Sequence, residues 1–367
     1  MALHRRDVLK TGLGLSAVSL LAPYARAAET SSAFDPQPGA WRSFEITTEI
    51  NILKPQGLTQ AWIPLPSISE SAWMRPEGDS WQIASGHAAV AESGGAKLLH
   101  VRWPDGDAAP AIKIVSRVST RDRAVDLSKP GTPKSLAPEE RTAYLSPTAL
   151  IPTDGIVKQT SDRIVAGAIG EEDKARRIYE WVVENTFRDP KTQGCGTGDV
   201  ASMLEAGNLG GKCADLNALY VGLARAAGLP ARDLYGIRVA PSRFGYKCLG
   251  ANSATITKSQ HCRAEVYLSR FGWVPADPAD VRKVVLEEPP GNLPLDALKV
   301  IAARKTLFGA WEGNWIAYNC GHDIVLPGSH EKPIGFLMYP QAETAAGMHN
   351  ELSPDTFQYT ITTREVV

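Results

Sequence analysis

The segment Gly210–Asn217, with the sequence GGKCADLN, places a cysteine where a helix of apolar periodicity begins. The apolar residues of this helix recur at intervals of three and four until Gly-Leu-Pro at 228–230 ends the pattern. At a helix N-terminus, unpaired backbone N–H groups and the helix dipole favour the thiolate, which is the reactive form of cysteine. The same N–H groups can bind a developing oxyanion. Taken alone, Cys213 is either such a nucleophile or a buried structural cysteine.

Further along the chain, the segment His261–Leu268 alternates between apolar and polar residues, which predicts a β-strand. Cys262 lies on the apolar face of this strand, and His261 lies on the polar face. Asp277 follows the next predicted strand, 16 residues after His261. Its carboxylate faces the same side as His261 if the loop between the strands has an odd number of residues, and the loop Ser269–Phe271 meets this condition.

These residues supply the parts of a thiol acyl-transfer site. A thiolate needs a base that can become imidazolium, and that histidine needs a carboxylate to fix its tautomer. We expect Cys213 to be the nucleophile, His261 the base and Asp277 the orienting carboxylate. Asp280 is the alternative for the orienting role. Glu265 shares the polar face of the histidine strand, where it enters the cleft, forms an ion pair with Arg263 or lies at the surface.

Residues 1–27 have the features of an export signal. Arg5 and Arg6 precede a short apolar segment, and the small-x-small sequence at 25–27 is typical of a cleavage site. The apolar segment is too short to span about 30 Å of hydrocarbon. Paired arginines followed by an apolar residue and Lys10 indicate a twin-arginine signal rather than an ordinary secretory one. We therefore expect a periplasmic or secreted protein that has no membrane anchor after cleavage.

Composition and spacing exclude several other classes of function. A formal net charge of −1 gives no indication of nucleic acid or an anionic membrane as partner. The Cys and His spacings do not match a zinc site, and the glycine-rich segment 194–198 lacks the Lys-Ser/Thr of a nucleotide loop. We therefore expect neither a metal nor a cofactor. The five cysteines are an odd number, so at least one is expected to be free, and the sequence assigns no pairs among Cys195, Cys248, Cys262 and Cys320.

The rest of the chain predicts an α+β fold in two parts. Residues 28–127 contain alternating strands separated by turn-sized gaps, which predicts an antiparallel β-sandwich-like domain. Residues 128–154 are rich in Pro, Ser and Thr and are interpreted as a linker. Residues 155–367 combine helices with strands and carry the three site residues. Strand-like runs at 314–319, 334–339 and 356–363 are expected to complete the sheet of this second part.

Two groups of motifs in this second part resemble the transglutaminase-like superfamily. The first is Gly211–Asp215 with the segment 226–232 (AAGLPAR), and the second runs from His261 through Gly-Trp-Val-Pro at 272–275 to Asp277-Pro278. The resemblance covers about residues 155–285. It implies a papain-like fold, in which a helix carrying the cysteine packs on an antiparallel sheet carrying the histidine and the aspartate. It also implies the roles given above for the three residues.

The chain after the signal resembles bacterial exported members of this superfamily in which a β unit precedes the catalytic domain. One position departs from the family pattern, because Cys262 follows the histidine where family members often have an aromatic residue. The backbone N–H of Cys213 is one expected oxyanion donor, and Gln193 is the second. GGKC followed by Asn217 also resembles arylamine N-acetyltransferases superficially, but the acidic residue does not match theirs.

The leading hypothesis is an exported thiol enzyme that forms a thioester with an amide or isopeptide substrate. Water would resolve the thioester in a cysteine peptidase or amidase, and an amine would resolve it in a transglutaminase-type transfer. A peptide or protein is the expected substrate, and cell-wall peptide is one candidate. The alternative hypothesis is a non-catalytic binding or assembly module in which the triad is vestigial.

Overall fold

The alternating segments after residue 41 form antiparallel strands, as predicted. The computed structural model describes residues 33–353 and 357–366, so the predicted signal peptide at 1–27 lies outside the described residues. The strands of this region are β1 (Arg42–Ile52), β2 (Thr59–Pro64), β3 (Met74–Ile83), β4 (His87–Ser93), β5 (Ala96–Trp103) and β6 (Ala111–Thr120).

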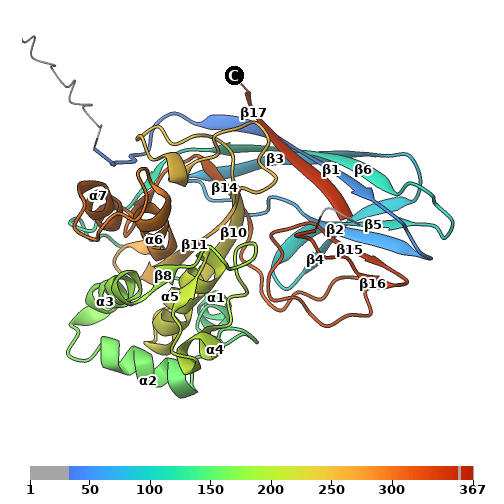
Figure 1. Cartoon of the computed structure of the whole chain (residues 1–367). Coiled ribbons are helices and arrows are strands. Elements are labelled where there is room, and N and C mark those ends of the chain that lie inside the picture. The colour runs from blue at the N-terminus through green and yellow to red at the C-terminus, as the bar shows by residue number, and fades with distance from the viewer. Residues whose placement is uncertain (1–32, 354–356, 367) are drawn as a thin grey trace, which may run out of the picture. The chain divides into compact units, whose positions relative to one another are not determined.

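The last strands of the chain join these first ones, which differs from the prediction. β17 (Phe357–Val366) pairs antiparallel with β1 over ten residue pairs, and Figure 1 shows the two strands side by side. β15 (Gln341–Thr344) pairs with β2, and β16 (Gly347–Met348) extends the same sheet. Two of the three runs expected to complete the catalytic sheet therefore do not join it: the last one forms β17 of the sandwich from Phe357 on, and 334–339 forms only an isolated bridge between Ile334 and Ile324. Only β14 (Trp315–Asn319) joins that sheet.

Two antiparallel sheets result, with the orders β17-β1-β6-β3 and β16-β15-β2-β5-β4. Apolar residues from both sheets, among them Ile50, Ile63, Val101 and Phe357, form one buried cluster. Alternation along each strand sends these side chains inward and leaves polar residues outside. The predicted β-sandwich-like arrangement is confirmed, with strands contributed from both ends of the chain.

The second part is built around helix α5 (Cys213–Ala226). Every residue of this helix except Asp215 is buried, which explains why its sequence is apolar on nearly all sides. The helix packs on a four-stranded antiparallel sheet of order β12-β11-β10-β14. Besides β14, this sheet contains β10 (Ala231–Arg238), β11 (Gln260–Leu268) and β12 (Gly272–Ala276).

Further helices surround α5 on the side away from the sheet or at its ends (Figure 1). α4 (Val200–Glu205) coincides with the helix that the sequence predicts at 200–205. α2 (Gly155–Ile164), α3 (Gly170–Asn185) and α7 (Leu298–Thr306) are shifted by a few residues from the helices predicted at 155–168, 171–187 and 295–305. Two α-helices of the described residues were not predicted: α1 (Pro138–Ala143), in the segment interpreted as a linker, and α6 (Pro278–Glu287), which begins directly after Asp277.

The segment interpreted as a linker is held against the second part. It contains the short helix α1 (Pro138–Ala143), and the carbonyls of Tyr144 and Ser146 accept hydrogen bonds from Ala231 and Arg225. Between residues 33 and 353, and between 357 and 366, no helix combines the length and apolar character needed to cross a membrane.

A cluster of buried tryptophans and arginines joins the sandwich to the catalytic sheet. Trp73 of the first part lies 5.4 Å from Trp311 between ring centroids, and Trp311 lies 6.0 Å from Trp315 on β14. The guanidinium of Arg123 lies over Trp311 at 5.0 Å, and that of Arg263 on β11 lies over Trp315 at 4.8 Å. Stacking on these rings accommodates two buried cations that would otherwise be poorly solvated.

Candidate active site

Cys213 is the first residue of α5, as the sequence predicted. Gly210 and Gly211 form the short strand β9, which pairs parallel with β8 (Phe187–Arg188) and aims the chain into the helix. Only 3% of Cys213 is exposed, and it lines a cleft of about 470 Å³. Its backbone N–H lies in the first turn of α5, where helix amides have no partner within the helix.

Asp215, which the sequence analysis did not single out, holds the loops around Cys213. Its carboxylate accepts hydrogen bonds from the backbone N–H groups of Thr197, Gly198 and Lys212, each at 2.9 Å. A Cβ on Gly196 would lie 1.8 Å from an Asp215 oxygen, so only glycine fits there. An acidic residue at the third position of a helix is a known capping signal, and it could have identified this role.

His261 and Asp277 face each other, as the strand parity predicted. β11 and β12 pair with Val266 opposite Val274, which leaves Ser269–Phe271 as the loop. Asp277 Oδ2 lies 2.8 Å from His261 Nε2, and both side chains are buried. Asp277 also caps α6 through a hydrogen bond from the N–H of Asp280 at 3.0 Å. The helix therefore fixes the carboxylate against the imidazole.

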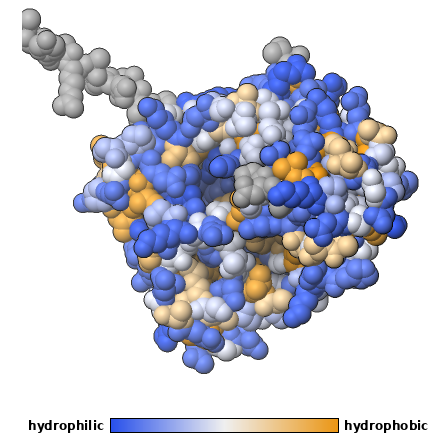
Figure 2. All heavy atoms as spheres, turned by 45° about the vertical axis from the view of Figure 1, so that its right-hand side comes forward, coloured by the Kyte–Doolittle hydropathy of each residue, from blue (hydrophilic) through white to orange (hydrophobic). Residues whose placement is uncertain are grey.

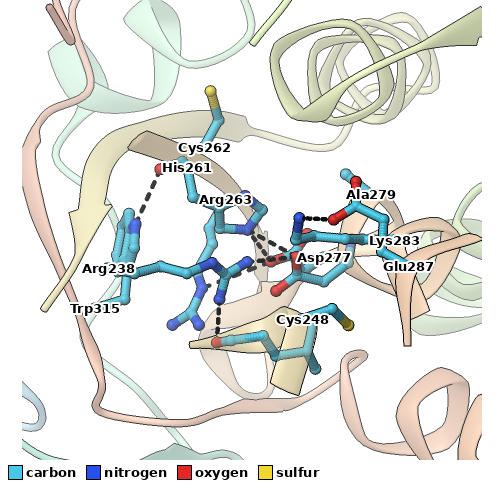
Figure 3. Close-up of polar contacts among 12 residues, drawn as sticks. Arg238, Cys248, His261, Cys262, Arg263, Asp277, Ala279, Lys283, Glu287 and Trp315 are labelled. Carbon is cyan, nitrogen blue, oxygen red and sulfur yellow. Dashed lines mark hydrogen bonds and ion pairs between the residues drawn. The ribbon is translucent and has the colours of Figure 1, made fainter. Parts of the chain in front are cut away.

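A second layer of polar groups supports this pair. Asp280, the alternative orienting residue, has its Oδ1 at 3.3 Å from His261 Nε2 and at 2.6 Å from Arg238. Asn217 Nδ2 donates to Asp277 at 3.2 Å and to the carbonyl of Cys262 at 2.8 Å (Figure 3 shows the surrounding contacts). Both carboxylates approach Nε2, so Nδ1 is the ring nitrogen that remains for the thiol.

The electrostatics favour an ion pair between the thiol and the imidazole. Burial and the nearby Arg238 oppose protonation of His261, but Asp280 and Asp277 outweigh them and raise its pKa to about 9. The pKa of Cys213 is well below its usual value, first through a hydrogen bond from Cys195, then through Cys262 and His261. Both shifts favour a thiolate paired with an imidazolium over a neutral thiol beside a neutral imidazole.

Two further thiols lie beside Cys213. Cys195, from the glycine-rich loop, is buried beside the start of α5, where its carbonyl accepts from the N–H of Ala214 at 2.9 Å. Cys262 is fully buried, as expected for the apolar face of β11, and it points to the other side of the strand from the His261 ring (Figure 3). All five cysteines of the chain are free thiols in the structure.

The predicted oxyanion residue Gln193 does not line the cleft. It is exposed, and its carbonyl accepts a hydrogen bond from Gly196. Gln260 lines the cleft instead, directly before His261. Its amide nitrogen is buried and has no hydrogen-bond partner in the described part of the chain. The sequence offered no signal for this, because the direction of a side chain at a strand end depends on tertiary contacts.

One cluster has the ligand types of a metal site. Atoms of His261, Asp277 and Asp280 lie within 4.8 Å of one another. Arg238 and Arg263 both contact these carboxylates, with Arg263 Nε at 3.5 Å from Asp277. Their positive charges disfavour a divalent cation at this position. The cluster is better suited to holding an imidazolium.

Comparison with known proteins now identifies the family. The sequence model of the transglutaminase-like superfamily matches residues 158–278, a range that contains Cys213, His261 and Asp277. The chain contains a domain of the transglutaminase-like superfamily. A relative from Haemophilus influenzae, itself uncharacterised, is 36% identical over 335 residues, which are 86% of this chain and 89% of the relative. The similarity therefore includes the β-sandwich as well as the transglutaminase-like domain.

Solved structures share the fold at low sequence identity. A candidate cysteine protease from Cytophaga hutchinsonii is 13% identical, with a TM-score of 0.50, and the match covers 89% of this chain and 99% of that one. The periplasmic domain of TgpA from Pseudomonas aeruginosa is 16% identical, with a TM-score of 0.34, over 67% of this chain and 90% of that one. The first similarity supports the predicted α+β transglutaminase-like fold.

Proposed function

We propose that this protein is a thiol enzyme that transfers acyl groups from amide or isopeptide substrates through a thioester on Cys213. The observation that carries the proposal is the contact of His261 Nε2 with Asp277 at 2.8 Å, which leaves Nδ1 of the ring for the thiol of Cys213. This thiol has a lowered pKa and lines an open cleft. A thiolate paired with a buried imidazolium is the usual form of an activated cysteine nucleophile.

In the first half of the reaction, the Cys213 thiolate attacks the carbonyl carbon of the amide. The carbonyl π electrons move to oxygen, and the Cys213 N–H and the free amide of Gln260 are the proposed donors to that oxyanion. The C–N bond then breaks, and the imidazolium of His261 gives its proton to the leaving amine. A thioester and a neutral imidazole remain.

In the second half, the neutral His261 removes a proton from the acceptor as it attacks the thioester. Water as acceptor gives a carboxylic acid, and an amine gives a new amide; both restore the thiolate and the imidazolium. Asp277 acts as a positioning residue throughout, because its carboxylate holds the ring orientation and stabilises the positive charge.

The test is mass spectrometry of the intact protein after incubation with peptide libraries, with and without added amines. We expect an acyl adduct on Cys213 that is absent in Cys213→Ala and present in Cys248→Ala, which removes another cleft-lining thiol. The released product identifies water or amine as the acceptor. No adduct, together with a Cys213 that iodoacetamide alkylates no faster than an ordinary thiol near neutral pH, would refute the enzyme and support a binding module with a vestigial triad.

We also propose that the protein acts outside the cytoplasm, in the periplasm or after secretion. The support is the predicted twin-arginine signal, with Arg5 and Arg6 before a short apolar segment. Fractionation of cells that express the full chain tests this. Cleaved protein should be found in the periplasmic or secreted fraction, and replacement of both arginines by lysine should retain the uncleaved chain in the cytoplasm. Export that persists in the lysine variant would contradict the twin-arginine route.

A further inference from the structure

The cleft around Cys213 is lined by positive charge. Five basic side chains line it, and Glu351 is the one acidic side chain among the described residues that do so. Figure 2 shows a face of the molecule with a hollow whose visible walls are mainly hydrophilic. The chain as a whole has a formal net charge of −1, so the positive charge is a local property of this cleft. The five basic residues are Arg188, Lys212, Arg238, Lys258 and Lys283.

Three of these five cations have carboxylate partners. Arg238 forms an ion pair with Asp280 at 2.6 Å, behind His261. Arg188 and Lys283 both contact Glu287, so two cations share one carboxylate. Even when Glu351 is counted with these two carboxylates, two of the five positive charges remain uncompensated.

Lys212 and Lys258 both line the cleft, and they form no ion pair within residues 33–353 and 357–366. Lys212 directly precedes Cys213, and Lys258 precedes His261 by three residues. Both therefore project from segments that hold reacting groups. A concave site with low-dielectric walls concentrates the field of such charges on a bound ligand.

The wall formed by the end of the chain is different in character. Leu352, Phe357 and Tyr359 line the cleft there with apolar and aromatic surface. This wall can bury hydrocarbon but offers little to an anion. The cleft thus has basic residues next to the reacting groups and an apolar wall formed by Leu352, Phe357 and Tyr359.

We propose that the site selects acyl donors that carry a carboxylate close to the scissile amide, and that Lys212 and Lys258 bind this carboxylate. The inference rests on the proposed function, because Cys213 is taken as the group that is acylated. A peptide with Asp or Glu beside the scissile bond, or with a free carboxylate there, fits the basic side. The carboxamide analogue has nearly the same shape but lacks the charge.

A pair of alkylating reagents tests the charge without needing a substrate. Iodoacetate is anionic and iodoacetamide is neutral, and both react with the same thiolate. The ratio of their rates at Cys213, measured by peptide mapping of the full chain after signal removal, therefore cancels any change in the thiolate fraction. Replacing Lys212 and Lys258 with glutamine should lower the iodoacetate-to-iodoacetamide ratio about 3- to 10-fold at low ionic strength, and salt should lower the wild-type ratio.

The matched control is Lys305→Gln with Lys332→Gln, since both lysines are exposed and neither lines the cleft. This control should keep the wild-type ratio. An unchanged ratio in the Lys212/Lys258 variant, or an equal fall in the control, would overturn the proposal. Slow alkylation of Cys213 by both reagents would instead refute the proposed enzyme, so the two failures are distinguishable. Single Lys258→Gln, at an exposed position, provides a second variant if the double one folds poorly.

Matched peptides then test the substrate class. Libraries that differ only in Asp and Glu against Asn and Gln near the scissile bond are compared for acylation of Cys213. We expect enrichment of the acidic members with the wild-type protein and loss of this enrichment in the Lys212/Lys258 variant. Equal acylation by the acidic and neutral members would refute the assignment of these lysines to a carboxylate.

Discussion

Replacing Cys195 with alanine tests how this fold lowers the pKa of Cys213. The hydrogen bond from Cys195 is the largest of the contributions that stabilise the thiolate, ahead of Cys262 and His261. A hydrogen bond to a charged group contributes about 1.5–3 kcal/mol, and one pKa unit corresponds to about 1.4 kcal/mol. The substitution should therefore remove stabilisation of this order and raise the pKa of Cys213, while leaving it below that of an ordinary thiol.

The assay is the rate of alkylation of Cys213 by iodoacetamide between pH 4 and pH 8. The midpoint of the rise in rate gives the thiol pKa, and in the variant this midpoint should move to higher pH. Cys248→Ala is the matched control, because Cys248 lines the same cleft and is not among the main groups that stabilise the Cys213 thiolate. A midpoint that stays in place in Cys195→Ala, or moves equally in Cys248→Ala, would refute this explanation.

Three further perturbations follow from the structure. With a His261 pKa of about 9, deprotonation of the imidazolium should cause turnover to fall above that pH, and Asp277→Asn should move this fall to lower pH and reduce kcat/KM about 100-fold or more. Gly196→Ala places a Cβ 1.8 Å from Asp215, and it should lower the free energy of unfolding by about 2–4 kcal/mol in denaturant titrations. Glu265→Gln removes the carboxylate that Arg123 contacts and one of the two that contact Arg232, and it should lower the free energy of unfolding by about 3–5 kcal/mol in the same titrations.

Each of these has a contradicting result. An alkaline limb unmoved by Asp277→Asn would mean that another group titrates there. Gly207 has a positive φ of 63° with open space around it, so Gly207→Ala should cost less than Gly196→Ala, and equal losses would show that the contact with Asp215 is unimportant. If Glu265→Gln left the free energy of unfolding unchanged, the ion pairs of Glu265 with Arg123 and Arg232 would not stabilise the fold.

The sequence predicted those parts of the site that depend on local periodicity. The apolar repeat and the glycines placed Cys213 at the start of α5, and the alternation in β11 with an odd loop placed Asp277 on the face of His261. Helix α6 was missed although its signal is local, because Asp277 followed by Pro278 is a typical cap and first helical residue.

The remaining features depend on contacts between distant segments. Alternation indicates that 357–366 is a strand, but it does not say which sheet the strand joins. Three sheets have edges that could accept it, and its pairing with β1 depends on burial in the folded protein. Glu265 was expected in the cleft, in an ion pair with Arg263 or at the surface; it is instead fully buried and pairs with Arg123 and Arg232 from other segments. The ion pair of Arg238 with Asp280 behind His261 also depends on distant segments, because the two residues lie 42 positions apart in the chain.

The pairing of β17 with β1 has a consequence for the order in which the protein is made. β1 emerges first from the ribosome and finds its neighbour β17 only after about 300 further residues have been synthesised. Phe357 and Tyr359 belong to that last strand, and both form part of the cleft wall around the nucleophile. A chain that has not reached β17 therefore lacks part of the cleft wall, and the thiol acquires these surroundings only after β17 has been synthesised and has paired with β1.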